Sequence, residues 1–361
     1  MTIDYHPRRS KVSKLLASRN LDSCVILGAE NLRFLSGFTG TAGALVIGED
    51  HSVFLTDSRY VTQAHSQVDA DLIVEYKQPT EGIVRQLKTL GCERIGFEGS
   101  LSFQQVQELR EKGDPHWAWE VLNEELTVLR AIKSEAEIVL LREAASLNAE
   151  AFEEILPRIR PGVSEREISL HLEFALKMRG AEEKAFDFIV ASGERGALPH
   201  GVACDRVLQD GELVTIDFGC RVNGYHSDET VTLALGEPEA VMQEIYAIVL
   251  EAHDRAIEAV APGIALSELD RVARTFIQDT GYGEYFGHGL GHGVGLSVHE
   301  QPTVSPRSKA IAEEGMVITI EPGIYLPGQG GVRIEDMVLV TAEGSSVLTS
   351  LPKQYRTIAT C

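Results

Sequence analysis

The stretch Gly287-His288-Gly289-Leu290-Gly291-His292-Gly293-Val294-Gly295, followed by Val298-His299-Glu300, has glycine at every second position of its first part. Five glycines in a helix would cost roughly 1 kcal/mol each relative to alanine, so we expect an extended chain and not a helical pair of zinc ligands. In an extended chain His288 and His292 lie about 13 Å apart, at ~3.3 Å per residue. Only one of them can therefore bind a given ion. Because glycine allows the backbone to approach a ligand closely, this stretch predicts the floor of a binding site.

The region that contains this stretch repeats an earlier region at a constant offset, from 161 to 262 and from 180 to 281. Pro161-Gly162 recurs as Pro262-Gly263, and Gly180 recurs as Gly281. Each Pro-Gly pair follows a predicted helix (148–156 and 251–260) and leads into another (165–179 and 267–280) that a glycine ends, as is usual at helix C-termini. Pro-Gly alone is a common turn, but the four matched features favour a duplication. They predict a pseudo-twofold α+β domain whose site draws ligands from both halves.

The first copy contains a predicted hairpin that carries two acids. Asn223-Gly224 follows the apolar run 213–219 and is the strongest short signal for a two-residue hairpin turn. In that register Asp217 lies diagonal to Asp228 on one face, at about 7–8 Å between backbones. The alternative is that both aspartates lie on the outer face of the hairpin and are solvated. Because the strand is apolar and a buried carboxylate needs a partner, we interpret the pair as a cation site.

The second copy places two more acids at apolar strands. Glu321 ends the run 317–320, and Glu335 lies inside the run 332–340. Each acid alone could be a buried ion-pair partner, for instance of Arg333. Four acids in apolar strands next to a histidine-rich floor are explained more simply by a metal centre.

The first third of the chain predicts a separate α/β domain. Short apolar strands are expected at 23–27, 42–47, 52–56 and 117–121, with a helix at 104–112. One of these strands is followed by the polar residues Asp57, Arg59 and Tyr60. We interpret their role as a structural ion pair. Ser134 and Glu137 form a capping box that begins a long helix. The domains are therefore predicted to span 1–124 and 125–361.

Composition restricts the partners. The 54 acidic and 33 basic residues give a net charge of −21, which argues against nucleic acid and anionic membranes. No apolar run approaches the ~20 residues of a membrane span, and the N-terminus lacks the apolar core of a secretory signal. Five cysteines without metal-type spacing suit a reducing compartment, so we expect a cytoplasmic protein.

These motifs resemble the pita-bread metallopeptidases, the family of aminopeptidase P, prolidase and methionine aminopeptidase. The resemblance rests on Ile216-Asp217-Phe218-Gly219, Ser227-Asp228, the 287–295 stretch with His299-Glu300, Glu321-Pro322-Gly323 and Arg333-Ile334-Glu335-Asp336. Segments 35–40 and 56–60 resemble the creatinase-like N-terminal domain of Xaa-Pro peptidases. The resemblance implies an α+β fold: a duplicated pseudo-twofold pita-bread catalytic domain, preceded by an α/β creatinase-like domain.

The resemblance also implies a set of metal ligands. Two divalent ions would be held by Asp217, Asp228, His292, Glu321 and Glu335. By resemblance the two aspartates serve one ion and His292 the other, and some acids bridge. A carboxylate-rich set favours Mn²⁺, ahead of Co²⁺ or Zn²⁺.

Further residues resemble the catalytic support of the family. His288, His299 and His200 would position substrate, whereas Glu321 and Glu335 would also carry protons. Arg333 would hold Glu335 or a substrate carboxylate. One departure is Thr230-Val231-Thr232, where the family often has Thr-Arg-Thr; it removes no ligand.

The expected function is hydrolysis of the bond that precedes proline, with release of the N-terminal residue, by a homodimeric Xaa-Pro aminopeptidase. Its substrate would be a peptide with proline in second position. The alternative is a prolidase restricted to Xaa-Pro dipeptides. A non-catalytic pita-bread binding protein is disfavoured, because such proteins lose metal ligands and all five positions are filled here.

Overall fold

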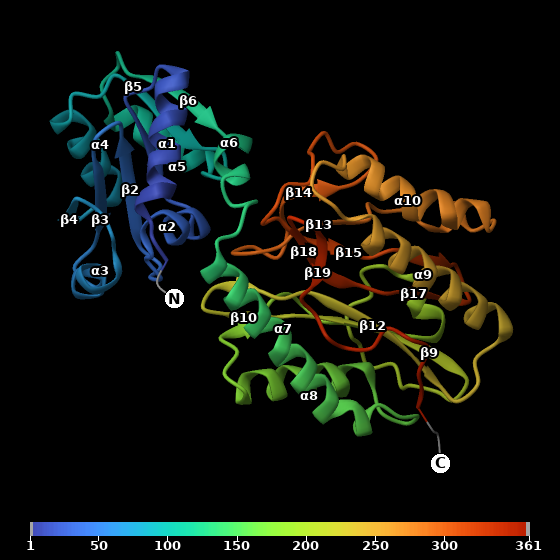
Figure 1. The fold of residues 1–361 in the computed structure, drawn as a ribbon. Helices are drawn as coiled ribbons and strands as arrows, with labels where there is room; N and C mark the ends of the chain where they lie inside the picture. The colour runs from blue at the N-terminus through green and yellow to red at the C-terminus, as the bar shows by residue number, and fades with distance from the viewer. Residues whose placement is uncertain (1–2, 359–361) are drawn as a thin grey trace. The chain divides into compact units, whose positions relative to one another are not determined.

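The computed structural model describes residues 3–358 and contains two compact units, which divide between Arg130 and Ala131 (Figure 1). The sequence analysis placed the division at 124/125. The short helix α6 (Glu124–Val128) groups with the first unit, and the chain passes into the second unit a few residues later.

The first unit is a six-stranded sheet with helices, as expected for an α/β domain. Its strand order is β4-β3-β2-β1-β5-β6, in which β2 is antiparallel to both of its neighbours and the other pairs are parallel. The strands are β1 (Ser23–Ile26), β2 (Gly43–Gly48), β3 (Ser52–Thr56), β4 (Leu72–Glu75), β5 (Arg94–Glu98) and β6 (Ala118–Leu122). The other helices are α1 (His6–Arg19), α2 (Ala29–Ser36), α3 (Val61–Gln67), α4 (Pro79–Thr89) and α5 (Phe103–Lys112).

Asp57 and Arg59 form the expected ion pair after β3. Arg59 Nη2 lies 2.7 Å from Asp57 Oδ2, and the arginine side chain is 70% exposed. Tyr60 contacts the pair through its ring, over which Arg59 Cζ lies 5.6 Å from the centroid, and its hydroxyl contacts Thr41 Oγ1 at 2.8 Å. An exposed pair of this kind contributes little to stability, which supports a local structural role.

The second unit consists of two similar halves. The first half contains helices α7 (Glu135–Ile155) and α8 (Glu165–Met178) and the antiparallel strands β8 (Ile189–Ser192), β9 (Glu212–Phe218) and β12 (Glu229–Leu235). The second half contains α9 (Ala240–Ala259) and α10 (Leu266–Asp279), followed by the antiparallel strands β13 (Gly291–Gly293), β15 (Val317–Ile320) and β18 (Asp336–Thr341). In Figure 1 the strands lie between the α7–α8 pair and the α9–α10 pair.

Glycine conformations confirm the internal repeat. Gly162 and Gly263 have φ values of 91° and 89°, and Gly180 and Gly281 have φ values of 102° and 92°. These left-handed conformations favour glycine, so the same backbone turn recurs at both copies. The expected capping box is also present, with Ser134 and Glu137 at the start of α7.

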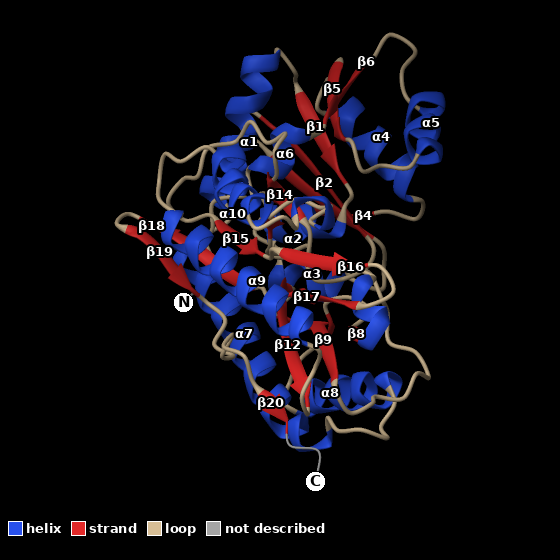
Figure 2. Cartoon of the chain, turned by 90° about the vertical axis from the view of Figure 1, so that its right-hand side faces the viewer, coloured by secondary structure: helices blue, strands red, loops and turns tan. Residues whose placement is uncertain are grey.

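Smaller elements complete the second unit. Strands β7 (Glu183–Lys184), β10 (Cys220–Val222) and β11 (Tyr225–His226) form a small sheet, and β16 (Gly323–Leu326) pairs with β17 (Gly330–Arg333). Strands β14 (Glu300–Val304) and β19 (Gly344–Val347) extend the sheet of the second half. Figure 2 shows β20 (Thr357–Ile358) near β12, with which it pairs. Short 3-10 helices are η1 (Leu156–Arg158), η2 (Gly193–Ala197) and η3 (Gly283–Tyr285).

The hairpin of the first half has the predicted register. Val222 pairs with Tyr225 across a turn whose residues Asn223 and Gly224 have φ values of 46° and 75°. Asp217 pairs with Thr230 in β9 and β12, which places it diagonal to Asp228. An isolated bridge then joins Thr230 to Glu335 of the second half.

The glycine-rich stretch forms no helix, as predicted, and its residues 291–293 are extended as β13, whereas the chain bends at His288 and Leu290. His292 lies in β13 opposite Thr303, and a bulge follows it. A Cβ atom on Gly291 would lie 1.9 Å from the carbonyl oxygen of Thr319. Only glycine therefore allows β13 to pack this closely beside β15.

Among the described residues, no helix has both the length and the apolar character needed to cross a membrane.

The core of the first half generates a stability prediction. Phe152 of α7 is 2% exposed and stacks on Phe218 with ring centroids 5.6 Å apart, whereas Phe174 of α8 is 65% exposed. Phe152→Ala is expected to lower the free energy of unfolding by about 3–5 kcal/mol, because it leaves a cavity. The control Phe174→Ala should stay within about 0.5 kcal/mol of the wild type. Urea denaturation of the full chain measures both, and equal losses would contradict this assignment of the core.

Candidate metal centre

One pocket of the second unit, with a volume of ≈ 470 Å³, brings all the candidate site residues together. Both halves of the duplication contribute to it. Its polar lining contains Asp217, Asp228, His292, Glu321, Glu335, His288, His299, His200 and Arg333. Its apolar lining includes Phe186, Ile189, Pro199 and Val202.

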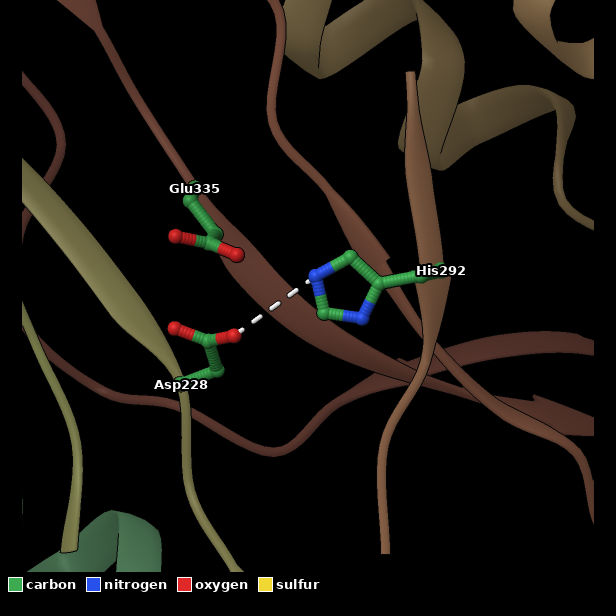
Figure 3. Close-up of side chains that lie close together, drawn as sticks. All are labelled: Asp228, His292 and Glu335. Carbon is green, nitrogen blue, oxygen red and sulfur yellow. Dashed lines mark ion pairs between the residues drawn. The ribbon is translucent and has the colours of Figure 1, made fainter. Parts of the chain in front are cut away.

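Three of the proposed ligands converge most closely. Ligand atoms of Asp228, His292 and Glu335 all lie within 4.8 Å of one another (Figure 3). His292 Nε2 lies 3.7 Å from Asp228 Oδ2 and 3.3 Å from Glu321 Oε1. His292 Nδ1 lies 3.0 Å from the carbonyl oxygen of Gly293, to which it can donate. That tautomer leaves the lone pair of Nε2 facing the carboxylates, which is the arrangement of a metal-binding histidine.

The carboxylates are half satisfied by the protein. Thr230 Oγ1 donates to Glu335 Oε2 at 2.7 Å, and Arg333 Nη2 donates to Asp217 Oδ2 at 2.6 Å. Glu335 Oε1 and Asp217 Oδ1 are buried and have no hydrogen-bond partner among the described residues. A bare buried carboxylate oxygen is costly unless a cation binds it. These residues therefore fit a metal site, in which one oxygen is fixed by a neighbour and the other is free to coordinate.

The electrostatics of the pocket also fit cations. Burial raises the pKa of Asp228 well above its usual range, and the nearby Glu335 and Asp217 raise it further. Burial likewise raises the pKa of Glu335 and of Glu321. Burial lowers the pKa of His292, which favours the neutral imidazole that can coordinate a metal. Divalent ions would compensate the repulsion and keep the carboxylates ionised.

His288 lies in the pocket but outside this cluster. Its Nδ1 is 2.8 Å from the carbonyl oxygen of Gly289, and its Nε2 is 2.8 Å from the hydroxyl of Tyr325. Both ring nitrogens are therefore engaged, whereas Nε2 of His292 faces the acids.

Tyr325 is a site residue that the sequence analysis missed. Its buried hydroxyl also lies 3.1 Å from Arg333 Nη1, so a continuous chain of contacts runs from His288 through Tyr325 and Arg333 to Asp217. A tyrosine in the apolar strand β16 carries no signal that distinguishes it from a core residue. The sequence analysis expected Arg333 to hold Glu335 or a substrate carboxylate. The first alternative needs correction, because the guanidinium of Arg333 pairs with Asp217.

The remaining histidines are more open. His299 and His200 are both exposed, and the ring of His299 lies 4.3 Å from that of His292 in an edge-on arrangement. Glu300, next to His299, is buried and pairs with Lys133 at 2.8 Å. Val231, the departure from the family motif, is 4% exposed and packs in the core of the first half.

Comparisons with known proteins agree with this architecture. Residues 8–132 match the Creatinase/Prolidase N-terminal domain, and residues 139–342, more than half of the chain, match metallopeptidase family M24. The Xaa-Pro dipeptidase of Pyrococcus furiosus is 40% identical over 350 residues, which are 96% of this chain and 99% of that protein.

Two solved structures are similar over nearly the full length. The Xaa-Pro dipeptidase from Bacillus anthracis has a TM-score of 0.96 and 42% identity, and the alignment covers 98% of this chain and 100% of that one. The X-Pro aminopeptidase from Thermotoga maritima has a TM-score of 0.88 and 36% identity, with 97% and 99% covered. These matches confirm the pita-bread catalytic domain and the creatinase-like domain before it. The chain thus belongs to metallopeptidase family M24 and is a peptidase with a Creatinase/Prolidase N-terminal domain.

Proposed function

We propose that the chain is a metal-dependent Xaa-Pro dipeptidase that hydrolyses the bond preceding proline. One observation carries the proposal: four carboxylates, three of them buried, and the imidazole of His292 come from both halves of the duplication and converge in a single pocket. The relatives favour the dipeptidase, which was the alternative in the sequence analysis, over the aminopeptidase. Dipeptidases are 40% and 42% identical to this chain, and the compared aminopeptidase is 36% identical.

In this proposal two divalent ions, Mn²⁺ by preference, are held by Asp217, Asp228, His292, Glu321 and Glu335. When bound, such ions polarise the scissile carbonyl and make a water molecule more acidic. Glu335 and Glu321 would serve as proton carriers, because their carboxylates line the pocket beside the other proposed ligands.

The other pocket residues bind and orient the peptide. His299 and His200 offer exposed rings that can donate hydrogen bonds to it. Phe186, Ile189 and Val202 supply apolar surface for a proline ring, which has no N–H to satisfy. His288 and Tyr325 act indirectly, because they hold Arg333 against Asp217.

The compartment and assembly expected from the sequence remain proposals. Cys24, Cys92, Cys204 and Cys220 are free thiols, which suits the cytoplasm. We also retain the homodimer and the absence of nucleic-acid and membrane partners, the latter because of the net charge of −21.

The carboxylate-rich site predicts strict metal dependence. Dialysis against EDTA should abolish hydrolysis of Ala-Pro, and Mn²⁺ or Co²⁺ should restore it better than Mg²⁺, which binds dedicated protein cages poorly. Release of free proline measures the rate. Full activity in protein shown by elemental analysis to be metal-free would contradict the proposed centre.

Substrate length separates the dipeptidase from the aminopeptidase. We expect kcat/KM for Ala-Pro to exceed that for Ala-Pro-Ala by about tenfold or more, equivalent to about 1.4 kcal/mol of transition-state binding. Ala-Ala is the control for the proline requirement. Faster cleavage of the tripeptide would favour the Xaa-Pro aminopeptidase.

The two histidines of the glycine-rich stretch should differ in metal content. His292→Ala is expected to lower both metal stoichiometry and rate, because Nε2 faces the carboxylates. His288→Ala should keep the metal and lose rate, by less than the about 2.7–4 kcal/mol that loss of a direct transition-state hydrogen bond costs, because its ring contacts Tyr325 and acts through Arg333. Elemental analysis of each purified variant measures the metal content. Loss of metal in the His288 variant, with metal retained in the His292 variant, would make His288 the ligand.

A further inference from the structure

Each half of the duplication has a second acid directly after a proposed metal ligand. Glu229 follows Asp228 at the start of β12, and Asp336 follows Glu335 at the start of β18. Side chains alternate between the faces of a strand, so the second acid points away from the side that the ligand occupies. Asp228 and Glu335 line the pocket, whereas Glu229 and Asp336 are buried and take no part in its lining.

One lysine binds both of these second acids. Lys353 Nζ lies 2.7 Å from Glu229 Oε1 and 3.2 Å from Asp336 Oδ1, and its side chain is 6% exposed. A backbone hydrogen bond also joins the starts of β12 and β18: the amide of Glu335 donates to the carbonyl oxygen of Thr230 at 3.2 Å. Lys353 therefore lies behind the point where the two halves of the site meet.

The segment around Lys353 is itself fixed. The backbone amide of Leu351 donates to Glu229 Oε1 at 3.2 Å, and Thr349 Oγ1 donates to Asp336 Oδ1 at 2.5 Å. The carbonyl oxygen of Lys353 accepts from the hydroxyl of Tyr246 at 2.8 Å. The segment 349–353 thus reaches both strand starts through backbone and side-chain contacts, with the ammonium group between them.

We propose that Lys353 is a positioning residue of the metal centre: it ties the starts of β12 and β18 together from behind, so that Asp228 and Glu335 face the same ions. Without the lysine, Asp336 would keep His253, whose Nε2 lies 3.1 Å from its Oδ2, but Glu229 would lose its counter-charge. The two buried carboxylates would then repel each other and seek water, which would separate the strands. Metal ligands tolerate displacements of only about 0.5 Å, so a small separation of the strands weakens the site. This inference rests on the metal centre of the proposed function.

The sign of the effect distinguishes positioning from simple electrostatics. Removal of a cation close to the centre would by itself tighten the binding of another cation, because a repulsion is lost. Loss of strand position weakens binding. If a variant without the lysine charge binds metal more weakly, the cause is therefore the displaced strands and not the lost repulsion between cations.

The test is Lys353→Met, titrated with Mn²⁺ alone by calorimetry after removal of metal from the full-length protein. We expect the Kd for Mn²⁺ to rise about tenfold or more, which corresponds to about 1.4 kcal/mol. Lys353→Arg, which keeps a cation between the carboxylates, should recover most of the affinity. Unchanged or tighter binding by Lys353→Met would overturn the proposal, as would a loss confined to the thermal stability of the metal-free protein.

Lys177 provides a matched control. It also bridges two glutamates, with Nζ 3.0 Å from Glu173 Oε1 and 2.7 Å from Glu183 Oε1, but its side chain is 43% exposed and none of the three residues lines the pocket. Lys177→Met should bind Mn²⁺ as the wild type does. An equal loss in Lys177→Met would also overturn the proposal.

Two further comparisons complete the experiment. If Lys353→Met does not fold, the double variant Glu229→Gln with Lys353→Met removes the unpaired charge of Glu229. The double variant should fold but still bind Mn²⁺ more weakly than the wild type. Wild-type affinity in the double variant would refute the positioning role.

The wild-type titration separates this inference from the proposed function. Absence of Mn²⁺ binding by the wild type refutes the metal centre, whereas binding that is equal in wild type and variant refutes only the role of Lys353.

Discussion

The burial of several like charges in one pocket is the constraint on which the rest of the second unit depends. Asp217, Asp228, Glu321 and Glu335 line the same cavity, and burial opposes the ionisation of most of them. Carboxylates placed in this way are stable only with compensating cations or with protons. The protein supplies one guanidinium, from Arg333, and leaves oxygens of Asp217 and Glu335 unpaired. These unpaired oxygens are free to coordinate metal ions, which would supply the remaining compensation.

The internal duplication provides the geometry for this compensation. Each half presents acids at strands that meet at the bridge between Thr230 and Glu335. The proposed ligands come from both halves, Asp217 and Asp228 from the first and the other three from the second, so the affinity for metal would depend on how the halves are joined. Threonine hydroxyls and Arg333 fix single carboxylate oxygens on the pocket side. Lys353 supports the same strands from the other side. Metal binding and the folding of the two halves are in this way coupled.

Much of this architecture could be predicted from local patterns. Asn223-Gly224 determines the turn of its hairpin, because both residues adopt positive φ readily, and the register that follows places Asp217 relative to Asp228. The alternation of glycine in the 287–295 stretch excludes a helix and permits the close packing of Gly291 against Thr319. Conversely, Tyr325 and Lys353 could not be identified, because nothing in their local sequence indicates their contacts with His288, 37 positions away, and with Glu229, 124 positions away.

The sequence by itself determined which residue types could coordinate a metal, that the histidine stretch is not helical, and that the catalytic unit is duplicated. These features follow from short-range sterics and from the period of the apolar pattern, which act within a few residues. The tertiary structure alone decided that Arg333 pairs with Asp217 and not with Glu335, that both nitrogens of His288 are engaged, and that one lysine reaches both Glu229 and Asp336. The contacts of Arg333 with Asp217 and of Lys353 with Glu229 join residues 116 and 124 positions apart, and no local preference encodes that packing.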